Sequence, residues 1–334
     1  MSKKILLSLG TDTLLFQEGS AVRERIRGYA KDWDEMHIVV AADKSYRETA
    51  LAPNIWIYPT RSRFRALYPL DMIRLGKFII AGRGVTHITC QDPFLTGMAG
   101  ISLKRQSSLP LEIQVHTDIG SPNFTYTIGN KVRKALALSY LPKADTIRVV
   151  SNKIKDYIVN TLGISAVNVT VRPIAVDVEK FKWAPITVDL HDKYPQFKKI
   201  ALMASRLTRE KDIARALSAW SFVKIQSPGA GMVIVGTGPE EARLKHVAHK
   251  LGISDVVVFE TWLDQPTLAS YYKTADLFMS TSLFEGYGMT LVEAHAAGCR
   301  IVSTDVGVAR EIGATIVDWD DENVARGVIQ ALGV

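Results

Sequence analysis

Short apolar runs alternate with longer segments of mixed polarity along the whole chain. Runs such as ILLSLG, LEIQV, IALMA and MVIV are almost continuously hydrophobic, as strands buried on both faces of a parallel sheet are. The segments between them predict helices, among them one that follows Gly19-Ser20, one that starts near Pro239 and one that starts near Thr290. This alternation predicts an α/β fold built on parallel sheets.

The length of the chain predicts two domains. A chain of 334 residues exceeds what one hydrophobic core usually supports, and two prolines in a charged connection mark a junction near residues 173–186. We therefore predict an N-terminal domain over residues 1–181 and a C-terminal domain over residues 182–334. Both are expected to be Rossmann-like, doubly wound domains that face each other across a cleft.

Composition limits the cellular compartments and the kinds of site that the chain can have. The two cysteines give no disulfide framework, and the seven histidines are scattered without the spacing of metal ligands, so no metal is expected. No apolar run reaches the roughly 20 residues of a spanning helix, and the opening run ILLSLG lacks a cleavage site of small residues. These features predict a cytoplasmic protein.

Polar residues that follow the C-terminal strands are the first candidates for a site. The run IALMAS is followed by two cations, Arg206 and Lys211, and MVIV is followed by Gly236-Thr237-Gly238. A guanidinium grips a diphosphate through two parallel bonds, and an ammonium adds a point charge. Because position 241 of this glycine loop is a glutamate, the full dinucleotide fingerprint is missing, which disfavours a nicotinamide or flavin site.

The segment FEGYGMTLVEAHAAG, residues 284–298, carries the most specific signal. Gly286 and Gly288 allow backbone amides to approach an anion, and the helix expected near Thr290 directs its positive end to the same place. Glu285 and Glu293 flank that turn, and carboxylates accept hydrogen bonds from sugar and ribose hydroxyls. The pattern predicts binding of a nucleoside-diphosphate sugar.

Taken in order, SRLTREK, GTGPEEARL, YYKTADLFMSTS and FEGYGMTLVEAHAAG resemble the retaining GT-B glycosyltransferases of family four, the glycosyl transferases group 1. The resemblance implies that Arg206 and Lys211 hold the donor diphosphate, that Glu293 accepts from the ribose, and that Glu285 contacts the donor sugar. It also implies retention at the anomeric carbon, with the leaving phosphate accepting the proton of the acceptor, so that no dedicated base is needed.

The N-terminal half matches this family less strictly. Gly19 stands alone where the family usually carries a paired-glycine loop, and His116 follows the strand LEIQV at the place of a histidine that lies beside the donor sugar. The candidate catalytic residues are therefore Arg206, Lys211, His116 and Glu285. The candidate donor-binding residues are Gly19, Gly236, Gly238, Gly286, Tyr287, Gly288, Met289, Thr290, Leu291 and Glu293.

Charge is distributed unevenly between the halves. Residues 1–183 carry 26 Lys and Arg against 16 Asp and Glu, or +10, whereas residues 184–334 carry 15 against 18, or −3. This surplus suggests that the acceptor or its surroundings are anionic. The segment 61–83 interleaves arginines with large apolar residues and leaves two alternatives open, a helix lying on an anionic membrane or an ordinary amphipathic helix; residues 131–134 have the same ambiguity. No nucleic-acid-binding motif is present.

The sequence thus predicts a transferase that moves a sugar from a UDP- or GDP-sugar co-substrate to a hydroxyl acceptor in the synthesis of a glycolipid, polysaccharide or other glycoconjugate. No bound cofactor is expected; a lipid-linked acceptor and peripheral contact with the inner face of a membrane stay open. The family commonly has a final helix that crosses back over the N-domain, and the sequence up to Val334 predicts its absence. The alternative is a catalytically silent protein of the same fold that binds sugar nucleotides or serves as a membrane scaffold.

Overall fold

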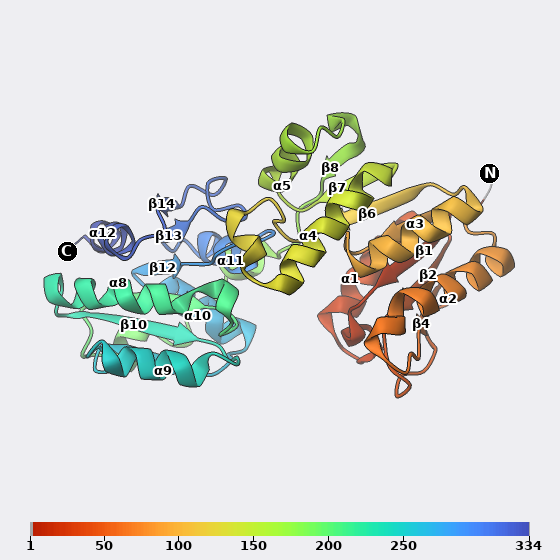
Figure 1. The fold of residues 1–334 in the computed structure, drawn as a ribbon. Helices are drawn as coiled ribbons and strands as arrows, with labels where there is room; N and C mark the ends of the chain where they lie inside the picture. The colour runs from red at the N-terminus through yellow and green to blue at the C-terminus, as the bar shows by residue number, and fades with distance from the viewer. Residues whose placement is uncertain (1–2, 334) are drawn as a thin grey trace. The chain divides into compact units, whose positions relative to one another are not determined.

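The computed structural model describes residues 3–333 and divides the chain into two compact units, one ending at Arg172 and one beginning at Pro173 (Figure 1). The predicted boundary at residues 181 and 182 falls inside α6 (Val178–Lys182). This helix lies with the second unit because it packs on α11 (Met289–Ala296), and Phe181 is buried edge-on to the ring of Tyr272, with centroids 6.1 Å apart.

The first unit is built on an eight-stranded sheet with the order β3-β4-β2-β1-β5-β6-β7-β8. Its strands are β1 (Ile5–Gly10), β2 (Glu35–Val40), β3 (Thr49–Ala52), β4 (Ile55–Pro59), β5 (His87–Cys90), β6 (Leu111–Val115), β7 (Thr146–Val149) and β8 (Val169–Val171). Its α-helices are α1 (Ala21–Tyr29), α2 (Tyr68–Arg83), α3 (Leu95–Ser107), α4 (Ile128–Tyr140) and α5 (Asn152–Asp156).

All pairings in this sheet are parallel except the edge pair of β3 and β4. The central strands are mostly hydrophobic, since helices cover a parallel sheet on its faces, and β1 is buried at every position. The apolar runs ILLSLG and LEIQV therefore form β1 and β6, as the sequence predicts.

The second unit is built on a six-stranded parallel sheet. Its strands are β9 (Lys199–Ala204), β10 (Ala230–Val235), β11 (Val257–Glu260), β12 (Leu277–Ser280), β13 (Ile301–Thr304) and β14 (Thr315–Val317). Besides α6 and α11, its helices are α7 (Leu190–Lys193), α8 (Ile213–Gln226), α9 (Glu241–Lys250), α10 (Gln265–Thr274) and α12 (Asp321–Leu332).

The strand order of the second sheet fixes where a ligand can bind. The order β11-β10-β9-β12-β13-β14 winds outward in both directions from β9, so the chain reverses direction between β9 and β12. In open α/β sheets the crevice at such a reversal, outside the carboxyl ends of the strands, is the usual ligand site. The loops that follow β9 and β12 are therefore adjacent at this edge.

A continuous apolar core supports that edge. Leu202 of β9 and Phe278 of β12 are neighbours in the sheet and fully buried, and Trp220 of α8 is buried with them in one cluster. The predicted α/β class with two doubly wound parallel sheets is confirmed. The predicted helix near Thr290 begins at Met289, and the one near Pro239 begins at Glu241, after a turn. Within residues 3–333, no helix combines the length and hydrophobicity that crossing a membrane requires.

Two helical glycines of the first unit differ sharply in their surroundings. A Cβ added at Gly100 of α3 would lie 2.2 Å from Cys90 Sγ, whereas one added at Gly82 of α2 would meet no atom within 4 Å. We expect Gly100→Ala to lower the free energy of unfolding by about 1–3 kcal/mol through overpacking. The matched control Gly82→Ala should raise it by up to about 1 kcal/mol, because alanine is the better helix former. Urea unfolding of both variants measures the difference, and equal stabilities would contradict this packing.

Candidate functional site

The loop that follows β9, residues 205–212, carries both predicted cations and is called here the cation loop. It contains a single 3-10 turn, Arg209–Lys211, and then Asp212 in the left-handed conformation with φ of 42°. Aspartate tolerates that conformation better than most residues. Asp212 Oδ2 accepts from Arg215 Nε at 3.0 Å, which fixes the start of α8 directly behind Lys211.

The loop that follows β12, residues 281–288, is called here the glutamate loop, and it is bonded to the cation loop at several points. The ammonium of Lys211 pairs with Glu285 Oε1, with side chains only 15% and 18% exposed. Leu283 N donates to Glu210 O at 2.8 Å, and Thr281 Oγ1 donates to Asp212 O at 2.9 Å. The structure thus brings together two residues that lie 74 positions apart in the sequence.

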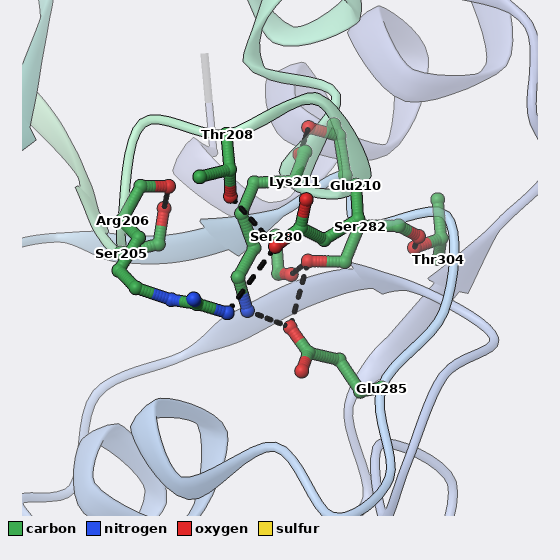
Figure 2. Close-up of polar contacts among 10 residues, drawn as sticks. Ser205, Arg206, Thr208, Glu210, Lys211, Ser280, Ser282, Glu285 and Thr304 are labelled. Carbon is green, nitrogen blue, oxygen red and sulfur yellow. Dashed lines mark hydrogen bonds and ion pairs between the residues drawn. The ribbon is translucent and has the colours of Figure 1, made fainter. Parts of the chain in front are cut away.

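Two hydroxyls hold Glu285 in place from the sheet edge. Ser282 Oγ donates to Glu285 Oε1 at 2.9 Å, and Thr304 Oγ1, at the end of β13, donates to the carbonyl of Ser282 at 2.8 Å. Figure 2 shows both, together with Lys211, whose ammonium points at the Glu285 carboxylate. Neither Ser282 nor Thr304 was singled out from the sequence, although each stands at or just after the carboxyl end of a strand.

Arg206 differs from Lys211 in its exposure. Its side chain is 69% exposed, and one terminal nitrogen contacts Glu210 Oε1 at 3.2 Å (Figure 2). Glu210 is also bonded by Thr208 Oγ1 at 2.8 Å, so the carboxylate is fixed and the guanidinium is tethered at one nitrogen. The remaining N–H groups face solvent and can bind an anion, while Lys211 supplies a half-enclosed charge beside them.

Gly236 and Gly238 allow a second loop to approach the cation loop closely. A Cβ at Gly236, which has φ of 142°, would lie 1.9 Å from Ser205 O, and one at Gly238 would lie 2.3 Å from Leu207 O. Leu207 N donates to Thr237 O at 2.9 Å across the same contact. The local geometry therefore requires both glycines for backbone packing; direct donor contact by either stays a prediction.

The glycine turn before α11 leads into the helix that the sequence predicts near Thr290. Gly288 has φ of 87° and precedes the helix, so the amides of Met289 and Thr290 have no intrahelical acceptor. Gly307, not noticed in the sequence, supports this turn: with φ of 50°, its Cβ would lie 2.2 Å from Tyr287 O. Burial and the nearby Glu311 raise the pKa of Tyr287, which keeps its phenol neutral.

Leu291 makes contacts within the protein. Its amide donates to Gly288 O at 3.0 Å and its side chain is buried, which favours the two preceding amides for ligand binding. Glu293 is buried one turn further on, and its Oε2 accepts from Tyr272 Oη at 3.1 Å. Burial raises the pKa of Glu293, and the bond from Tyr272 opposes that shift. Within residues 3–333, Glu293 Oε1 has no partner, so it can accept from a ligand hydroxyl.

In the first unit, His116 follows β6 and is held by a polar network on one face of the sheet. Its Nε2 lies 3.0 Å from Gln114 Oε1, which also accepts from the Arg148 guanidinium. The Gln114 amide nitrogen donates to Thr89 Oγ1 at 2.9 Å and Glu112 Oε1 at 3.2 Å.

This network fixes the proton of His116. Arg148 can only donate and Glu112, as a carboxylate, can only accept, so the Gln114 oxygen must face Arg148 and His116. Nε2 of His116 therefore carries the hydrogen, and Nδ1 is left as an acceptor. Although the residue as a whole is exposed, surrounding protein atoms and then Arg148 lower the pKa of His116, so the ring is neutral near pH 7.

Asp118, which also follows β6, and the predicted donor-binding residue Gly19 have local structural roles. The buried Asp118 accepts through Oδ1 from Gly120 N and Ser121 N, both at 3.0 Å, which closes the turn after β6. Gly19 has φ of 72° in the turn before Ser20, which caps α1. The parts of His116 and Gly19 in donor binding stay predictions. Among residues 3–333, no group of three or more His, Cys, Asp or Glu side chains could hold a metal ion.

Two family models match successive parts of the chain. Residues 19–180 match the model described as Glycosyltransferase Family 4, and residues 191–325 match the model described as Glycosyl transferases group 1. An uncharacterized glycosyltransferase of Methanocaldococcus jannaschii is 26% identical over 73% of this chain and 65% of its own length. The α-monoglucosyldiacylglycerol synthase of Streptococcus pneumoniae is 28% identical over 65% of this chain and 51% of its own length.

Among solved structures, sucrose-phosphate synthase of Thermosynechococcus elongatus superimposes with a TM-score of 0.77 at 16% identity, covering 99% of this chain and 90% of that one. Two doubly wound units, with a cationic loop at the reversal of the second sheet, place the molecule in the GT-B fold class. The chain belongs to the group 1 glycosyltransferases. It spans between half and two thirds of the length of the two curated relatives described above.

We expect wild-type His116 to be the neutral Nε2–H tautomer, and Gln114→Glu to raise its pKa by at least about one unit, because a carboxylate favours the imidazolium. Nitrogen-15 NMR of the histidine rings as a function of pH measures both quantities, with the other histidines as internal controls. A dominant Nδ1–H tautomer in the wild-type protein would show that the network does not hold His116 in this way.

Proposed function

We propose that the protein transfers a sugar from a nucleoside-diphosphate sugar to a hydroxyl acceptor, with retention at the anomeric carbon. The observation that carries this proposal is the Lys211–Glu285 pair at the reversal of the second sheet. It unites a cation suited to a diphosphate with a carboxylate suited to sugar hydroxyls at the edge where such ligands bind.

The surrounding groups suit the rest of a donor molecule. Arg206 offers free guanidinium N–H groups, and the amides of Met289 and Thr290 add donors at the positive end of α11. Glu293, with one carboxylate oxygen unused in the described chain, suits a ribose hydroxyl. Each of these interactions belongs to binding or to charge stabilisation, which is the kind of catalysis this donor chemistry requires.

In the proposed reaction, the bond between the anomeric carbon and the diphosphate oxygen breaks while the acceptor oxygen bonds to the same face of that carbon. The departing diphosphate takes the acceptor proton, and Arg206 and Lys211 stabilise its charge. This scheme needs no dedicated general base, and Asp118 Oδ1 accepts from two backbone amides. His116, neutral with a free Nδ1, suits a hydroxyl of the donor sugar.

We propose a lipid-linked acceptor in glycolipid or related glycoconjugate synthesis. Its support is the similarity to a relative named as a glucosyldiacylglycerol synthase, whose name specifies a lipid product, and the +10 surplus of residues 1–183. The cytoplasmic location expected from the sequence is part of the same proposal. Both UDP and GDP sugars remain donor candidates, and the next experiment separates them.

Thermal unfolding with UDP, GDP, ADP and CMP tests donor binding without an acceptor. A ligand of the native state should stabilise the second unit by about 2.7 kcal/mol at a hundredfold excess over its Kd. We expect a rise in Tm with UDP or GDP that Glu293→Ala reduces. No rise with any of the four would contradict donor binding, whereas a rise without turnover on any acceptor would favour the catalytically silent protein.

Lys211→Ala should lower the rate of sugar transfer by about ten- to a hundredfold, the effect of losing one charge-assisted contact. Without an acceptor, the rate of donor hydrolysis should fall by the same factor. The matched control is Arg209→Ala, because Arg209 belongs to the same loop but its exposed side chain pairs with Glu240 at 3.5 Å. Release of nucleoside diphosphate measures both variants. Equal activity of Lys211→Ala and Arg209→Ala would exclude Lys211 from the reaction.

A further inference from the structure

The segment Arg61–Arg83 exposes large apolar side chains among cations in the first unit. It comprises the loop after β4, the 3-10 turn Arg65–Leu67 and α2, drawn in orange in Figure 1. Phe64, Leu70 and Phe78 are 60%, 64% and 76% exposed. We call these residues and the neighbouring cations the α2 surface. It consists of Arg61, Arg63, Phe64, Arg65, Leu70, Arg74, Lys77 and Phe78.

The α2 surface is distinct from the buried face of the helix. Met72, Gly76 and Ile79 recur at spacings of four and three residues and are buried against the unit. Leu70, Arg74 and Phe78 recur at spacings of four residues on the outer face, and Lys77 lies beside them. The segment therefore does form a helix with one buried face, but burial of that face leaves the exposed Leu70 and Phe78 unexplained.

The charge of the α2 surface is strongly one-sided. Asp71 is the only acidic residue in the segment 61–83, and it is already bonded, by Ser62 Oγ at 2.6 Å and by Arg74 at 3.5 Å. Arg63 lies over the ring of Phe64, with its guanidinium carbon 5.3 Å from the centroid. Apolar groups and cations are thus interleaved rather than separated, which suits a surface that is anionic outside and apolar just beneath.

We propose that the α2 surface docks onto a bilayer that contains anionic lipids. Phe64, Leu70 and Phe78 enter the boundary between headgroups and acyl chains, while the cations meet anionic headgroups. A second copy of the chain is a poor occupant, because a symmetric contact would oppose the same cations on both partners. The interaction goes beyond sugar transfer and does not need it.

The position of this surface also bears on the proposed reaction. The α2 surface begins immediately after the carboxyl end of β4, and His116 follows the carboxyl end of β6 in the same parallel arrangement. Carboxyl ends of parallel strands share one edge of a sheet. The loop with which the α2 surface begins therefore lies at the same edge of the sheet as His116, where the proposed acceptor would have to be presented; this step rests on the proposed function.

Co-sedimentation of the full chain with lipid vesicles tests the docking. We expect binding to vesicles of phosphatidylglycerol and phosphatidylcholine, little binding to phosphatidylcholine alone, and weakening as salt rises from 0.05 to about 0.5 M. The triple variant Phe64→Ser, Leu70→Ser, Phe78→Ser should lower the partition coefficient at least about tenfold. Arg63→Gln with Arg65→Gln and Arg74→Gln should remove most of the preference for anionic lipid.

The control removes three exposed apolar side chains elsewhere, Val167→Ser, Phe222→Ser and Ile225→Ser, and should bind vesicles as the wild type does. The docking is overturned if the wild type does not sediment with anionic vesicles, or if the triple variant binds as well as the control. Near-ultraviolet circular dichroism verifies that each variant is folded. Because vesicle binding needs neither donor nor turnover, its failure leaves the response to nucleoside diphosphates intact and is distinguishable from failure of the proposed function.

Discussion

The ion pair between Lys211 and Glu285 is the interaction on which the candidate site depends. It joins the loops that follow β9 and β12, the two strands between which the second sheet reverses its winding. Without a ligand, the half-buried ammonium needs a counter-charge, and Glu285 supplies it. A bound diphosphate would offer the ammonium a stronger partner and release the carboxylate for hydroxyl groups. The ion pair therefore joins the two loops in the free protein and, in our proposal, is the place where the donor binds.

Close backbone contacts hold the two loops that carry Lys211 and Glu285 in position. Gly236 admits the carbonyl of Ser205, and Gly307 admits the carbonyl of Tyr287, at distances that exclude any side chain. Each glycine lies on a loop that supports one partner of the pair. Thr304 Oγ1 at the end of β13 bonds the glutamate loop to the sheet, and Thr281 and Leu283 bond the glutamate loop to the cation loop. This rigidity suits a site that acts through preorganised charge.

The strands and the position of α11 could be predicted because continuous apolar runs and a glycine turn before a helix are local signals. The contact of Lys211 with Glu285 could not, since it depends on β12 lying next to β9, an order that local periodicity does not encode. The same holds for the network around Gln114, whose members come from three neighbouring strands. Periodicity likewise predicts the helix within residues 61–83. It does not predict which apolar residues of that helix stay exposed, such as Phe78.

Calorimetric titration of UDP and GDP into the wild type, Lys211→Ala and Glu285→Gln tests the central claim most directly. If the ammonium binds the diphosphate and Glu285 competes for it, Lys211→Ala should weaken binding about ten- to a hundredfold, while Glu285→Gln should bind at least as tightly as the wild type. A purely structural ion pair would not give this difference between the two variants, because loss of either partner would then weaken nucleotide binding to a similar extent. Wild-type affinity in Lys211→Ala would contradict the account.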